Sequence, residues 1–164
     1  MNIIVKKNRF IVFGSYKLKC AIGKSGIKTF KKEGDSGTPK GTFNLGFLYY
    51  IKDKIKKLKA KIKKKIIKKN MGWCNDSQSS KYNKEIRFPF KYKAEKLYRK
   101  DKIYDLFINI KYNTSPVLKK RGSAIFLHIA NRNYRPTLGC IAISKKDFIK
   151  ILPLINKNTK ISIN

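Results

Sequence analysis

The chain has 164 residues, which is long enough to bury one hydrophobic core and too short for two. Its residues are 41% hydrophobic and 12% aromatic, a composition that excludes an intrinsically disordered chain, and no run approaches the roughly 20 apolar residues of a membrane-spanning helix. The formal net charge is +32, and so large a basic surplus makes acidic macromolecules candidate partners.

The first third of the chain has the pattern of short strands. Residues 2–5, 9–13 and 17–22 are apolar-rich runs separated by turn-forming residues. A stretch dense in Gly, Ser, Asp and Pro follows over residues 23–41. After it, the aromatic run at residues 42–51 predicts a further strand.

Residues 52–70, the Lys-rich segment, fit two periodicities. Its apolar residues fall at helical spacing (Ile55, Leu58, Ile62, Ile66), yet four of them also lie on one face of a strand (Leu58, Ala60, Ile62, Ile66). A basic amphipathic helix would suit a membrane surface or an acidic partner. An insertion or edge strand rich in lysine is the alternative, because edge lysines discourage intermolecular pairing. We favour the strand or loop.

The second half of the chain predicts buried strands and one helix. Residues 106–110, 124–129 and 141–143 are nearly continuous apolar runs. Ser144 to Asp147 has the form of a capping box that opens a helix over residues 145–154, and residues 160–163 form a last strand. We therefore expect residues 1–164 to form a single, mainly β domain with one or two short helices.

Three cysteines occur at positions 20, 74 and 140, and His128 is the only histidine. There is no CxxC pair and no second histidine, so no metal site and no cofactor are expected. In an oxidising compartment a Cys20–Cys74 disulfide that leaves Cys140 free is one alternative, and three free cysteines are the other.

Cys140 and His128 have the residue types of a nucleophile and its base. Cysteine attacks as the thiolate, so it requires a nearby base. If the strands at 124–129 and 141–143 are adjacent, the loop between them brings the two side chains together. The residues alone leave open a plainer reading, in which Cys140 is a small buried hydrophobe and His128 a satisfied core residue.

A set of motifs in a fixed order resembles the L,D-transpeptidase (YkuD-type) catalytic domain. The central part is a histidine, here His128, followed by Pro-Thr-Leu-Gly-Cys at residues 136–140 and a hydrophobic strand. The resemblance extends over about residues 20 to 163. The motifs are similar to those of a compact bacterial branch of that family. Its further motifs are Lys32–Asp35, Thr38–Phe43, Gly72–Asp76, Glu95–Asp101 and Tyr104-Asp105.

The resemblance implies a β-sandwich or barrel fold and acyl transfer on peptidoglycan stem peptides. In that reading Cys140 attacks a carbonyl of the stem peptide, and His128 takes the thiol proton and later protonates the departing amine. The backbone N–H groups of Gly139 and Cys140 form the oxyanion hole. An amine then resolves the acyl-enzyme in transpeptidation, or water does so in L,D-carboxypeptidase or endopeptidase activity.

Substrate binding departs from the family pattern. Many members carry Arg or Asn two residues after the cysteine, where this chain has Ala142. We expect Thr137, Arg132 and Arg135 to contribute to substrate binding, with the two arginines as candidates for a substrate carboxylate; solvated loop charges are the alternative. His128 requires an orienting acceptor, which is a backbone carbonyl in the family, with Asp105 as the alternative.

A second function class is a basic, non-catalytic module that binds nucleic acid or anionic cell-envelope polymers. Of the 41 basic residues 35 are Lys, whereas direct readout of bases and phosphates favours Arg, so no specific nucleic acid is expected. Lys, Ile and Asn, all encoded by AT-rich codons, account for 71 residues. Compositional drift on a solvated surface therefore explains much of the charge, although anionic envelope polymers stay possible partners.

The expected location follows from function alone. The N-terminal residues alternate apolar and polar side chains and show no secretory signal peptide. Peptidoglycan cross-linking takes place outside the cytoplasmic membrane, so the periplasm or cell envelope is expected, and the protein is expected to act as a monomer.

Overall fold

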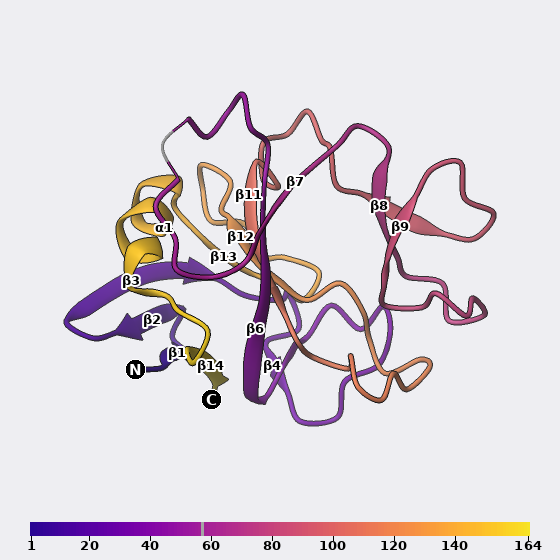
Figure 1. The fold of residues 1–164 in the computed structure, drawn as a ribbon. Helices are drawn as coiled ribbons and strands as arrows, with labels where there is room; N and C mark the ends of the chain where they lie inside the picture. The colour runs from indigo at the N-terminus through magenta and orange to yellow at the C-terminus, as the bar shows by residue number, and fades with distance from the viewer. Residues whose placement is uncertain (57) are drawn as a thin grey trace.

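The computed structural model describes residues 1–56 and 58–164. Its main sheet has nine strands (Figure 1). The first strand in sheet order also pairs with the eighth, so it is not a free edge. In sheet order the strands are β11 (Leu106–Ile110), β12 (Phe126–Ile129), β13 (Ile141–Ile143), β3 (Tyr16–Ala21), β2 (Phe10–Phe13), β1 (Ile3–Lys6), β14 (Lys160–Ile163), β6 (Gly41–Tyr50) and β7 (Lys64–Ile66).

Strand β6 closes this sheet into a barrel. Its first half pairs with β14, with Ile163 opposite Gly41, and its second half pairs with β11, with Leu106 opposite Tyr50. One long strand therefore hydrogen-bonds to both ends of the ring, and only β7 remains outside it. The expected mainly β fold is confirmed.

Two smaller sheets stand beside the barrel. One has the order β10 (Ala94–Lys96), β8 (Met71–Cys74) and β9 (Glu85–Arg87), and the other pairs β4 (Ile27–Lys28) with β5 (Thr38–Pro39). In Figure 1, β8 and β9 lie on the side of the barrel opposite the C-terminal helix. The indole N–H of Trp73, in β8, donates to the Asn83 side-chain oxygen at 3.0 Å, so a buried polar group on this sheet is satisfied.

Two hydrophobic clusters lie on opposite faces of strands β11, β12 and β13. Because side chains alternate between the faces of a strand, Leu127 and Ile141 pack in the first cluster, inside the barrel. Phe107 and Phe126 pack in the second cluster, which also holds Trp73 of the β8 sheet. These three strands are thus buried on both faces, as their continuous apolar sequences predict.

The Lys-rich segment forms no helix in its described part, residues 52–56 and 58–70. It runs through turns into β7, which pairs parallel to the end of β6. Ile55 and Ile62 are buried against the barrel core, while Lys56, Lys59 and Lys61 are exposed. The apolar spacing therefore serves to anchor an extended segment to the barrel.

The predicted helix forms as α1 (Lys145–Ile151), followed by a short 3₁₀ helix, η1 (Leu152–Leu154). Ser144 is its N-cap, because its hydroxyl accepts from the Asp147 N–H at 3.0 Å. Phe148 and Ile151 are fully buried and fix the helix against the barrel. Within the described residues, no helix has the length and apolar character needed to cross a membrane.

Loss of the N-cap should weaken this end of the fold. We expect Ser144→Ala to lower the free energy of unfolding by about 1 kcal/mol, since the Asp147 N–H loses its acceptor. Denaturant unfolding of the purified chain measures the change. Lys146→Ala, an exposed position of the same helix, should stay within about 0.5 kcal/mol of the parent; equal losses for both variants would contradict the capping role.

Candidate active site

Strand alternation brings Cys140 and His128 onto the same outer face of the barrel. β12 and β13 are parallel neighbours, and His128 stands level with Ala142. Cys140 precedes β13 by one residue, so it lies two positions before Ala142 and points the same way. Leu127, Ile141 and Ile143 alternate with these residues along the two strands and point inward to the barrel core. Core packing therefore fixes the face on which the Cys140 and His128 side chains lie.

This face opens into a cavity of about 580 Å³ between the barrel and the β8 sheet. Both Cys140 and His128 line it, together with residues of the turn-rich segment, of β10 and of the loop before Cys140. Its other lining residues include Lys31, Glu33, Asn75, Lys93, Glu95, Arg99, Tyr104, Ala124, Asn131, Arg135, Thr137 and Leu138.

The Cys140 thiol is held by two backbone groups. Its Sγ donates to the Ala124 carbonyl at 3.1 Å and accepts from the Phe126 N–H at 3.3 Å. Burial raises the pKa of this thiol to about 12, so the resting side chain carries its proton. Cys20 and Cys74 are also free and buried, but neither lines the cavity.

His128 is neutral and oriented by the backbone. Its Nδ1 lies 2.9 Å from the Ile129 carbonyl, so Nδ1 carries the proton and Nε2 is left as a proton acceptor. Burial lowers the pKa of the imidazole to about 4. Asp105 forms an ion pair with Lys54 at 3.0 Å, and the acceptor for Nδ1 is a backbone carbonyl.

A glycine turn positions Cys140. Gly139 has φ of 135°, and a Cβ there would lie 2.8 Å from the Gly37 carbonyl, so only glycine fits. Thr137 Oγ1 accepts from the Gly139 N–H at 3.1 Å and donates to the Cys140 carbonyl at 2.6 Å. The Gly139 N–H is thus occupied at rest, whereas the Cys140 N–H has no acceptor within the described chain. Of the two expected oxyanion donors, Cys140 is the free one.

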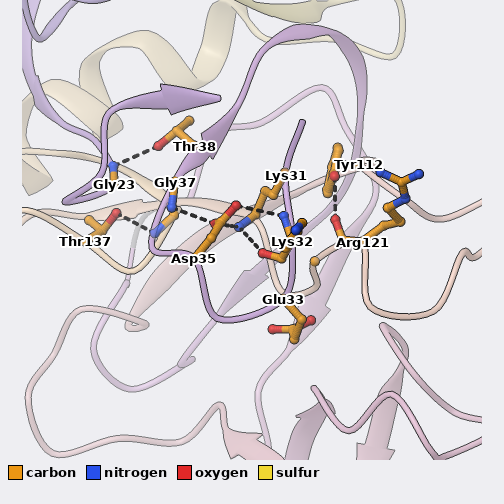
Figure 2. A network of polar contacts seen from close by, with 12 residues as sticks. Gly23, Lys31, Lys32, Glu33, Asp35, Gly37, Thr38, Tyr112, Arg121 and Thr137 are labelled. Atoms are coloured by element: carbon orange, nitrogen blue, oxygen red, sulfur yellow. Dashed lines mark hydrogen bonds and ion pairs between the residues drawn. The ribbon is translucent and has the colours of Figure 1, made fainter. Parts of the chain in front are cut away.

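The turn-rich segment wraps a buried ion pair beside this turn (Figure 2). Lys31 Nζ lies 2.6 Å from Asp35 Oδ1, and the lysine side chain is only 3% exposed. Asp35 also accepts from the N–H groups of Gly37 at 2.8 Å and Lys32 at 2.7 Å. Burial raises the pKa of the Asp35 carboxyl, but these hydrogen bonds outweigh it and hold the pKa below its usual value. Hydrogen bonds from the backbone to the Asp35 side chain therefore hold this turn.

The expected carboxylate-binding arginines differ in position. Arg135 lines the cavity, and its backbone N–H donates to the Asn131 side chain at 2.8 Å. Arg132, three residues earlier, is exposed and is not among the lining residues.

Sequence reasoning assigned no role to three residues of the cavity wall, Glu95, Arg99 and Tyr104. The Tyr104 hydroxyl donates to Glu95 at 2.8 Å, and its ring meets the His128 ring edge-on, with centroids 5.4 Å apart. The Arg99 guanidinium lies 5.3 Å from the Tyr104 ring centroid. In the sequence these residues are marked only by their place in the family motifs, and that place indicates no chemical role. Among the described residues, no cluster of His, Cys, Asp and Glu is arranged to hold a metal ion.

Comparison with known proteins gives one match. The family model described as the L,D-transpeptidase catalytic domain (YkuD) matches residues 3–163, nearly the whole chain. Searches of curated proteins and of solved structures give no significant match.

Alkylation of the unliganded protein should report the state of the Cys140 thiol. Because its pKa lies near 12, the thiolate fraction and the iodoacetamide rate should rise about tenfold per pH unit from pH 7 to pH 9. Cys140 should react before Cys20 and Cys74, which do not line the cavity. Peptide mass spectrometry over a time course measures each site, and a rate that levels off below pH 8 would contradict a neutral resting pair.

The buried ion pair gives a double-mutant test. Asp35→Asn should cost roughly 3 kcal/mol of unfolding free energy, since it leaves the Lys31 ammonium buried with its charge uncompensated. The double variant Lys31→Met/Asp35→Asn should recover part of this loss. Thermal or urea unfolding of the four proteins completes the cycle; a double variant that loses the sum of both single changes would show that the two side chains do not interact.

Proposed function

The chain belongs to the L,D-transpeptidase catalytic domain family, and on that premise we propose that Cys140 is the nucleophile of an acyl transfer on peptidoglycan stem peptides, with His128 as its base. The observation that carries the proposal is the shared cavity face on which the thiol and an imidazole with a free Nε2 lie. As in the family generally, the reaction is placed outside the cytoplasmic membrane.

In the first half of the reaction a thioester forms. When the substrate carbonyl enters, the thiol proton leaves the Ala124 carbonyl and passes to His128 Nε2 while Sγ attacks the carbonyl carbon. The Cys140 N–H, free at rest, donates to the developing oxyanion. The imidazolium then protonates the departing amine of the terminal residue, the C–N bond breaks, and His128 returns to its neutral form.

The neutral resting pair suits a proton transfer that is coupled to attack. A thiol pKa near 12 and an imidazole pKa near 4 make a preformed ion pair unfavourable. The Ile129 carbonyl accepts from Nδ1 and stabilises the imidazolium as it forms. In the second half, an amine or water attacks the thioester, which gives a cross-link or a hydrolysed stem peptide.

Arg135 and Thr137 serve the substrate in different ways. Arg135 lines the cavity, and in this proposal its guanidinium binds a substrate carboxylate. Thr137 holds the turn that presents the Cys140 N–H, through its bonds to Gly139 and to the Cys140 carbonyl. Arg132 lies outside the cavity lining, so the proposal assigns the substrate carboxylate to Arg135.

Removal of the nucleophile should abolish acylation. With a purified muropeptide donor, Cys140→Ala should lower release of the terminal amino acid at least a thousandfold and remove the acyl-enzyme mass. His128→Gln should lower it about 100- to 10,000-fold. Product and intact-protein mass spectrometry measure both.

Cys74→Ala is the matched control, because Cys74 is also buried but does not line the cavity. It should keep both release and acyl-enzyme formation. Release that persists at the parental rate in Cys140→Ala contradicts the proposal. A parent protein that shows no acylation, but binds anionic polymers with a steep salt dependence, favours the basic binding module instead.

A further inference from the structure

Two of the three glutamates in this strongly basic chain lie on the wall of the cavity. Each of the three accepts a hydrogen bond from a tyrosine hydroxyl: Glu33 from Tyr82, Glu85 from Tyr49 and Glu95 from Tyr104. Glu85 is outside the cavity and also pairs with Lys65. The same lining also holds Lys31, Lys93, Arg99 and Arg135, so these two carboxylates stand among cations, in a chain of net charge +32.

Glu95 keeps an oxygen and a charge free for a ligand. Its Oε1 accepts from Tyr104 and lies 3.5 Å from Arg99, whereas its Oε2 has no protein partner within the described residues. Arg99 itself is bound by both carboxylate oxygens of Asp101. One cation thus faces two carboxylates, and the group of three keeps a net negative charge at the cavity wall.

A second unpartnered acceptor lies on the same face of the small sheet. Asn75 Oδ1 is buried, lines the cavity and has no hydrogen-bond partner in the described part of the chain. In the β8–β10 pairing Glu95 stands opposite Trp73, and the Asn75 N–H bonds to the Lys93 carbonyl just beyond. Asn75 and Glu95 therefore present acceptor oxygens toward the same space. A buried acceptor without a donor is unfavourable unless a ligand supplies one.

This negative charge does not assist the nucleophile. After burial, the charge of Glu95 is the next cause that raises the pKa of the Cys140 thiol. A carboxylate at this place opposes thiolate formation, so its benefit must arise at another step of the reaction. Two acceptors, one of them charged, fit a group with several N–H donors and a positive charge.

We propose that Glu95 and Asn75 bind the ammonium group of the acyl acceptor, a primary amine, and so favour cross-linking over hydrolysis. The inference rests on the proposed function of Cys140. The ammonium gives one proton to Glu95, and the neutral amine attacks the thioester carbon. The C–N bond forms, the C–S bond breaks, and the second proton passes from nitrogen through His128 to Sγ, which restores the thiol. Glu95 releases its proton to water with the product.

The test compares acceptors on the purified full-length chain with a muropeptide donor. Glu95→Gln should not lower acyl-enzyme formation, because the Glu95 charge opposes formation of the Cys140 thiolate, but it should lower the ratio of amine product to water product about tenfold or more, because a charge-assisted hydrogen bond is lost. With hydroxylamine, which is neutral at the assay pH, the ratio should change less than threefold. Asn75→Ala should lower the amine ratio in the same direction.

Glu85→Gln is the matched control, since Glu85 is also held by a tyrosine and a cation but lies outside the cavity; its product ratio should equal that of the parent. An unchanged amine ratio in Glu95→Gln overturns the proposal. So does an equal loss of acylation and of both acceptors, which would make Glu95 a positioning residue for Tyr104 and Cys140. Absence of acylation in the parent protein would instead refute the proposed function.

Discussion

The structure depends on the two-residue alternation in β11, β12 and β13, whose two faces are both buried. One face fills the barrel with branched aliphatic side chains, and the other packs aromatic rings against the β8 sheet. A shift of one residue in β12 would exchange Leu127 with His128 and place a polar ring inside the barrel. Core packing therefore also determines that His128 and Cys140 face the cavity.

Desolvation sets the chemical state of this pair. Both side chains are almost fully buried, at 5% and 9% exposure, and burial disfavours the charged form of each. The backbone compensates by satisfying both groups as neutral species: Ala124 and Phe126 hold the thiol, and the Ile129 carbonyl holds Nδ1. Under the proposed function, a pair that rests neutral attacks only when a substrate supplies the electrophile.

Local patterns predicted most of the elements, because strands and caps are encoded by neighbouring residues. The strands at the N-terminus, the capped helix after Ser144 and the last strand all lie where the sequence indicates. Closure of the barrel by β6 and the packing of the Lys31 side chain beside Gly122 and Gly139 depend on contacts between distant segments, which no local pattern contains. For the same reason Arg132 and Arg135 looked equivalent in sequence, yet only Arg135 lines the cavity.

The proposed binding of a cationic acceptor by a chain of charge +32 depends on local groups and not on the total charge. Exposed lysines are screened within about 8 Å at physiological ionic strength, so they act weakly on a buried site. Inside the cavity the nearest groups dominate, and there Asp35 neutralises Lys31 while Asp101 engages Arg99. Lys93 and Arg135 also line the cavity, so any effect of Glu95 on a ligand rests on its own unpartnered oxygen and not on the net charge of the wall. The effect of each acidic residue in this basic chain therefore depends on the position at which the fold places it.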